Sequence, residues 1–156
     1  MAKFLYRMQN ILDIKYKLED SAKQEYAEAR IRLNEEEEKL EALKIRKNEY
    51  YIQYQNAIQG NLDFLKIEEL ANAMDIMDEM IALQNEMVKK RNKELEKARA
   101  KLNQVMQERK MHEKLKEKQF DEFVVELNAQ ENKETDEVVS YQYNNSSDSL
   151  SELLYW

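Results

Sequence analysis

The chain has 156 residues, of which 37% are charged, and it contains one glycine, no proline and no cysteine. This composition is typical of long helices and coiled coils, and the lack of cysteine excludes disulfides and thiolate metal sites. The formal net charge of −7 is uneven, because the segment 89–118 is basic and the segment 120–156 is acidic. No stretch approaches the roughly 20 apolar residues of a membrane-spanning helix, and residues 1–12 lack the apolar run of a signal peptide, so we expect a cytoplasmic protein.

The first residues open a predicted helix that runs from Ala2 to Ile58. Their apolar side chains form a stripe that is wider than a two-stranded coiled coil requires. The stripe consists of Phe4, Leu5, Met8, Ile11, Leu12 and Leu18. Two interpretations remain open: the stripe packs within the chain, with Phe4 against Phe120, or it inserts into a partner.

Apolar residues recur at alternating spacings of three and four in both halves of the chain, as they do in coiled coils. When the chain is folded about residue 62, the repeat positions of one half meet those of the other. Leu43 then opposes Ile81, and Ala29 opposes Leu95. We therefore predict an all-α fold in which two long helices form an antiparallel coiled-coil hairpin.

Charged residues support the same register. Two sets of opposite charges face each other in this register: Lys44, Arg46 and Lys47 fall opposite Asp75, Asp78 and Glu79, and the acidic run 35–38 falls opposite the basic run 89–91. Such flanking charges set register and orientation more than they add stability. We expect them to pair across the hairpin.

The turn of the hairpin is predicted near residues 58–64. Gly60 is expected to adopt the left-handed conformation that ends a helix without a Cβ clash. Asn61 and Asp63 can then cap the second helix, which we expect to run from Asp63 to about Lys133.

Two regions follow from this assignment. Residues 1–140 form the hairpin, and residues 141–156 form an acidic, partly disordered tail. The polar run 144–149 is typical of disorder, whereas the apolar end 150–156 could form a short docking helix.

Little in the sequence points to catalysis. One glycine cannot form a phosphate-binding loop, and we expect no enzymatic activity, cofactor or metal. The single histidine, His112, is interpreted as a packed helix residue. The basic segment 89–118 has the charge that nucleic acid binding needs, but no aromatic residue lies between Arg91 and Gln119. A solvated face or an acidic protein partner is therefore favoured over nucleic acid.

The methionines give a more specific indication. Met74 and Met77 fit the repeat, whereas Met80 and Met87 lie toward a flank together with Ala73. Methionine side chains suit adaptable protein-binding surfaces. We interpret this flank as a partner site near the turn.

Three segments carry a resemblance to a known family: residues 4–13 (FLYRMQNILD), Asn48-Glu49-Tyr50 and the basic segment 109–118. In this order and spacing they resemble FliJ, the small coiled-coil component of the flagellar type III export apparatus. The resemblance covers about residues 1–140, and the tail from Tyr141 onward departs from the family.

The resemblance implies a stalk that inserts its open end into the hexameric export ATPase, FliI, while its turn end is linked to the export gate protein, FlhA. It also implies a role as an export chaperone that escorts other chaperones. Such a protein is peripheral to the cytoplasmic face of the membrane through its partners.

The implied sites fall at both ends of the hairpin. At the open end, the positions expected to enter the ATPase are Phe4, Met8, Ile11, Arg109, Lys110, Lys114 and Leu115. The positions that match the family's gate contact are Ala73, Met77, Met80 and Gln84, and Met87 lies beside them. Ala73 departs from the larger or aromatic residues that parts of the family carry at its position. The alternative function is that of a generic coiled-coil spacer, or of a chaperone unrelated to flagellar export.

Overall fold

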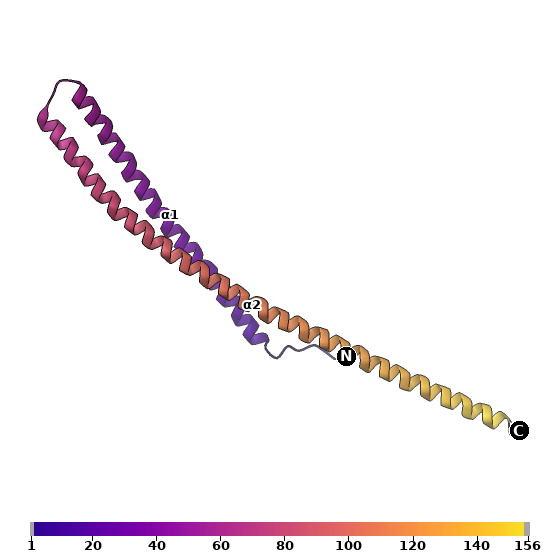
Figure 1. Cartoon of the computed structure of the whole chain (residues 1–156). Coiled ribbons are helices and arrows are strands. Elements are labelled where there is room, and N and C mark those ends of the chain that lie inside the picture. The colour runs from indigo at the N-terminus through magenta and orange to yellow at the C-terminus, as the bar shows by residue number, and fades with distance from the viewer. Residues whose placement is uncertain (1, 155–156) are drawn as a thin grey trace. The chain divides into compact units, whose positions relative to one another are not determined.

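The computed structural model describes the backbone of residues 2–154 and the side chains of residues 2–145. It contains two helices, α1 (Gln9–Gln59) and α2 (Phe64–Leu154), joined by a short turn (Figure 1). The chain divides into two units. The turn-end unit comprises residues 15–107, and the open-end unit combines the residues up to 14 with those from 108 onward.

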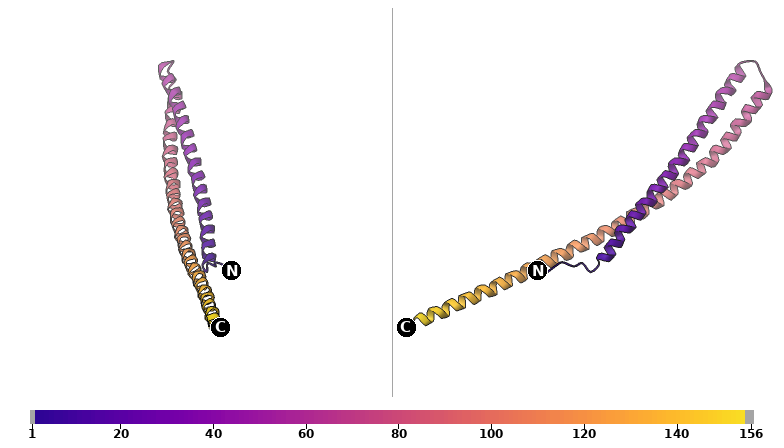
Figure 2. Two further views of the ribbon diagram at one scale, coloured as in Figure 1. Left: turned by 90° about the vertical axis from the view of Figure 1, so that its right-hand side faces the viewer. Right: turned by 180° about the vertical axis from the view of Figure 1, so that it is seen from behind.

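In the turn-end unit, α1 and α2 lie side by side in both views of Figure 2. Each predicted repeat position between residues 15 and 107 is buried or half-buried. The best-packed cluster contains Ala29, Leu33 and Leu95, with Tyr26 and Ala98 against it. The predicted all-α hairpin and its layer of Ala29 with Leu95 are therefore confirmed.

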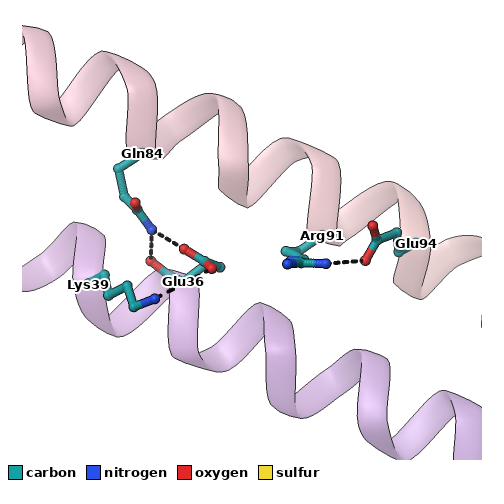
Figure 3. Close-up of polar contacts among 5 residues, drawn as sticks. All are labelled: Glu36, Lys39, Gln84, Arg91 and Glu94. Atoms are coloured by element: carbon teal, nitrogen blue, oxygen red, sulfur yellow. Dashed lines mark hydrogen bonds and ion pairs between the residues drawn. The ribbon is translucent and has the colours of Figure 1, made fainter.

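Polar contacts across the hairpin follow the predicted register only in part. Lys101 Nζ lies 2.9 Å from Glu25 Oε2. Lys47 forms an ion pair with Asp78, and each belongs to one of the two charged groups that were predicted to face each other. Arg91, however, pairs with Glu94 of its own helix at 3.0 Å (Figure 3) rather than with the acidic run 35–38. Residues three apart share one helix face, so this pair forms locally. The hydrogen bond from Arg91 lowers the pKa of Glu94.

The turn forms at the predicted residues but by a different geometry. Gly60 has no positive φ, which contradicts the expected left-handed cap. Its N–H instead donates to the Asn56 carbonyl at 3.2 Å, which continues the helical hydrogen-bonding pattern. Asp63 acts as the N-cap of α2, because its Oδ1 accepts from the Lys66 N–H at 3.4 Å and its carbonyl accepts from the Ile67 N–H at 3.0 Å.

The beginning of the chain departs from the predicted helix. Residues 2–6 have no regular structure, and α1 begins at Gln9, whose N–H donates to the Tyr6 carbonyl at 3.1 Å. Side chains alternate in this segment, so that Leu5 is 83% exposed while Tyr6 is 7% exposed. The prediction of a helix from Ala2, with Leu5 in its apolar stripe, is therefore wrong for this segment, because residues 2–6 are not helical.

Phe4 holds this segment against α2. Its ring centroid lies 5.2 Å from that of Phe120, edge to face, and 5.5 Å from that of Phe123. Such aromatic pairs stabilise contacts by about 0.5–1.5 kcal/mol beyond the area they bury. The interpretation that Phe4 packs within the chain is confirmed.

We predict that Phe4→Ala releases this segment. The two ring contacts contribute about 1 kcal/mol. Their loss should therefore let the segment open more often and accelerate tryptic cleavage after Arg7 several-fold. Leu5→Ala is the matched control, because Leu5 is exposed and should leave cleavage unchanged. Equal cleavage of the Phe4→Ala and wild-type proteins would contradict the role of Phe4.

α2 continues well beyond its predicted end near Lys133 and reaches Leu154. The sequence after Lys133 contains neither glycine nor proline, so no residue there strongly breaks a helix. Residues 128–145 are all exposed. The apolar end 150–156, interpreted as a docking helix, lies outside the residues whose side chains are described.

Candidate partner-binding surfaces

The open-end unit presents only part of the surface expected from α1. Phe4 is occupied by its contacts with Phe120 and Phe123, and Met8 is half-buried. Ile11 is 39% exposed and is therefore available to a partner.

A basic, apolar depression lies on α2 in the same unit. It has a volume of about 380 Å³, and its lining consists of Met111, His112, Lys114, Leu115 and Lys118. The lysines sit around an apolar surface, an arrangement that suits a partner with both apolar and acidic groups. We name this region, together with the exposed Lys110, the basic patch.

Two features of the basic patch differ from the sequence prediction. Met111, which the sequence reasoning missed, is 69% exposed one helical turn before Leu115. Met111 lies four residues before Leu115, which places both side chains on one face of the helix, and this spacing could be seen in the sequence. Arg109, which was predicted to bind a partner, is mostly buried and pairs with Glu113 at 3.0 Å.

In the turn-end unit, two of the five predicted gate residues are engaged within the hairpin. Met77 is only 5% exposed and lies in the seam. Gln84 is half-buried, and its Nε2 donates to the Glu36 carbonyl at 2.9 Å and also to the Glu36 carboxylate (Figure 3). A partner could reach these two side chains only by opening the seam.

The other gate residues lie on one accessible stripe of α2. Ala73 is half-buried, while Met80 and Met87 are 41% and 36% exposed. Ile76 and Leu83, which the sequence reasoning missed, lie between them and are 54% and 73% exposed. These five residues form what we call the flank stripe. Each precedes a seam position by one residue, so a second 3–4 repeat was visible in the sequence.

The turn itself is also apolar. Leu62, Phe64 and Leu65 are 59%, 77% and 68% exposed, around the capping residue Asp63. The sequence analysis placed these residues in the turn and at the start of the second helix and predicted no binding surface there. Three large apolar side chains within residues 62–65 were the signal in the sequence for an apolar surface at the turn.

The arrangement offers no evident reaction centre among the described residues. No group of three or more His, Asp or Glu side chains in that part of the chain could hold a metal ion. His112 lies in the seam, and its Nδ1 is buried without a hydrogen-bond partner among the described atoms. Within the same residues, neither helix contains a segment long and apolar enough to cross a membrane.

These features define a coiled-coil hairpin protein with separate candidate surfaces for other proteins. A family model described as "Flagellar FliJ protein" matches residues 4–148. The chain therefore belongs to the FliJ family, a family of coiled-coil components of the type III export apparatus that are generally not catalytic.

A solved structure supports the fold. The chain is similar to CT670 of Chlamydia trachomatis, which is described as a YscO homologue, with a TM-score of 0.60 and 22% identity. The alignment covers 94% of this chain and 99% of CT670. No curated protein matches the chain.

Proposed function

We propose that the protein is a stalk and chaperone of flagellar export that links a hexameric FliI-like ATPase to a FlhA-like export gate. The observation that carries this proposal is the presence of two chemically different exposed surfaces on the two units of the hairpin. The basic patch belongs to the open-end unit, and the flank stripe belongs to the turn-end unit.

The basic patch fits the ATPase ring. Lys110, Lys114 and Lys118 can attract acidic groups of a pore, and Met111 and Leu115 can fill apolar pockets. Charge of this kind accelerates encounter and orients the partner. In this function the hairpin promotes assembly of the ATPase ring, and the ATPase alone catalyses the reaction.

The flank stripe fits the gate. Met80 and Met87 offer flexible side chains that adapt to a partner, with Ile76 and Leu83 as larger apolar contacts. Because Met77 and Gln84 are engaged in the seam, Ile76 and Leu83 take their places in the gate contact, while Ala73 and Met80 remain in it.

The family membership supports the remaining parts of the proposal. The protein would act in the cytoplasm, peripheral to the membrane through its partners, and would also deliver export substrates and their chaperones. Neither nucleic acid nor a cofactor is part of this function.

The proposal is tested by capture of both partners on the immobilised full chain. FliI-like ATPase and the cytoplasmic part of the FlhA-like gate should each bind the wild-type protein. If neither binds, the protein is a spacer or a chaperone outside flagellar export.

We predict that Met80→Ser with Met87→Ser lowers gate binding and export about tenfold while ATPase binding is unchanged. The loss of two apolar contacts at an interface is of this order. Ile45→Ser with Ile52→Ser is the matched control, because these α1 side chains are 52% and 51% exposed but lie outside the flank stripe. Equal gate binding by the two double variants would exclude the flank stripe as the gate site.

A further inference from the structure

The flank stripe is a complete second coiled-coil repeat that has no partner within the hairpin. Its residues follow the spacing 3-4-3-4 along α2, and its two largest aliphatic side chains, Ile76 and Leu83, are more than half exposed. A repeat of this kind normally packs against another helix. The neighbouring charges indicate which helix that is.

A basic row borders the flank stripe on the α1 side. The contact of Glu25 with Lys101 shows which residues face each other on this flank. Arg46 lies three heptads after Glu25, and Met80 lies three heptads before Lys101, so Arg46 faces Met80. One heptad earlier on α1, Lys39 faces Met87 in the same way.

An acidic row borders the stripe on its other side. Glu79 and Glu86 each precede a stripe methionine by one residue, so the helical period places them on the side away from α1. Both are exposed. The stripe therefore has one basic and one acidic edge. The two edges lie at matching heights along the helices, because Arg46 faces Met80, which follows Glu79, and Lys39 faces Met87, which follows Glu86.

We propose that the flank stripe binds the same stripe of a second copy of this chain, in a parallel, in-register dimer. A twofold axis parallel to the helices brings the acidic edge of each copy against the basic edge of the other. Arg46 then pairs with Glu79 across the interface, and Lys39 pairs with Glu86. The stripe side chains form the apolar layers of a four-helix bundle.

The limits of the stripe agree with this arrangement. One heptad beyond Lys39 and Glu86, the same geometry brings Arg32 against Lys93, which repel each other. The pairs of opposite charge along the edges therefore end at the same height as the flank stripe, near Met87. An antiparallel dimer is disfavoured, because it would place the two acidic edges together and the two basic edges together.

The edge residues can form these new pairs at low cost. Glu86 is 3.4 Å from Lys89 in an exposed pair three residues apart. Lys39 is itself exposed and lies 3.7 Å from Glu36, whose mostly buried carboxylate also accepts a hydrogen bond from Gln84. Arg46 lies 5.9 Å from the centroid of the Tyr50 ring. Exposed local pairs of this kind are weak and are readily exchanged.

The dimer covers Met80 and Met87, which the proposed function assigns to the gate. Self-association and gate binding therefore exclude each other. The free protein would keep its gate surface covered until the partner displaces the second copy. The dimer itself does not depend on the proposed function.

Disulfide trapping tests the orientation of the full-length protein. The chain contains no cysteine, so Ala73→Cys introduces a single thiol. In the parallel dimer the two thiols meet, and mild oxidation should give a covalent dimer. An antiparallel dimer centred on Met80 would separate them by roughly 21 Å. Ile45→Cys, on the outer face of α1, is the control and should not cross-link.

Charge reversal tests the edges by analytical ultracentrifugation. Glu79→Lys with Glu86→Lys should raise the dimer dissociation constant about tenfold or more, and so should Lys39→Glu with Arg46→Glu. Because each variant complements the other, an equimolar mixture should recover dimers, and so should a chain that carries all four changes. Circular dichroism checks that each variant stays helical.

The outcomes separate clearly. A wild-type chain that stays monomeric at about 100 μM, a weak affinity, overturns the dimer, as does failure of the mixture to recover it. Absence of cross-linking through Ala73→Cys in a dimeric protein overturns the parallel orientation. Neither result decides the proposed function, because binding of the ATPase and of the gate is measured in a separate capture experiment.

Discussion

Replacing Leu95 by alanine should lower the free energy of unfolding by about 2–5 kcal/mol. Leu95 is 2% exposed and packs with Ala29 and Leu33 in the best-buried cluster of the hairpin. Truncation leaves a cavity that long, stiff helices cannot easily close. Urea unfolding followed by circular dichroism measures the change.

Two comparisons make this result specific. Ile31→Ala, at a position that is 56% exposed, should change stability by less than about 0.5 kcal/mol. Leu43→Ala should fall between the two, because Leu43 is only half-buried. Equal losses for Leu95→Ala and Ile31→Ala would contradict the assignment of the core.

Charge reversal of the basic patch is the second change with a large expected effect. Lys110→Glu with Lys114→Glu should weaken ATPase binding about tenfold or more, with most of the change in the association rate at low salt. Arg109 is left unchanged, because its pairing with Glu113 would confound the result. Binding is measured by surface plasmon resonance at two salt concentrations.

The matched control is Lys93→Glu with Lys97→Glu, which has the same spacing on α2 but lies in the turn-end unit. This variant should bind the ATPase as the wild-type protein does. If both double variants lose affinity equally, net charge rather than the basic patch governs the interaction.

The fold could be predicted from the sequence because the coiled-coil period repeats over many turns. The layer of Ala29 with Leu95 was predicted correctly, and so was the group of basic residues at 44–47 that faces the acidic residues at 75–79, because one register fixes every layer of a coiled coil. The start of α1 could not be predicted in this way. Phe4 finds Phe120 across the chain, and that contact overrides a local helical pattern.

The candidate surfaces were only partly predictable. Met80 and Met87 were predicted as flank residues, but Ile76 and Leu83 were not, because apolar residues next to a seam position look like core residues until their exposure is known. Met77 was assigned both to the seam and to a partner, and its burial identifies it as a seam residue. The ends of helices, such as the one at Gly60, depend on hydrogen bonds that the residue type alone does not specify.

The most direct test of the export function is deletion of this chain in the organism that encodes it. The proposed function predicts loss of flagellar protein export and of motility. The wild-type chain should restore both from a plasmid, and the Lys110→Glu, Lys114→Glu variant should not. Unchanged export after deletion, in cells that still swim, would contradict a role in flagellar export.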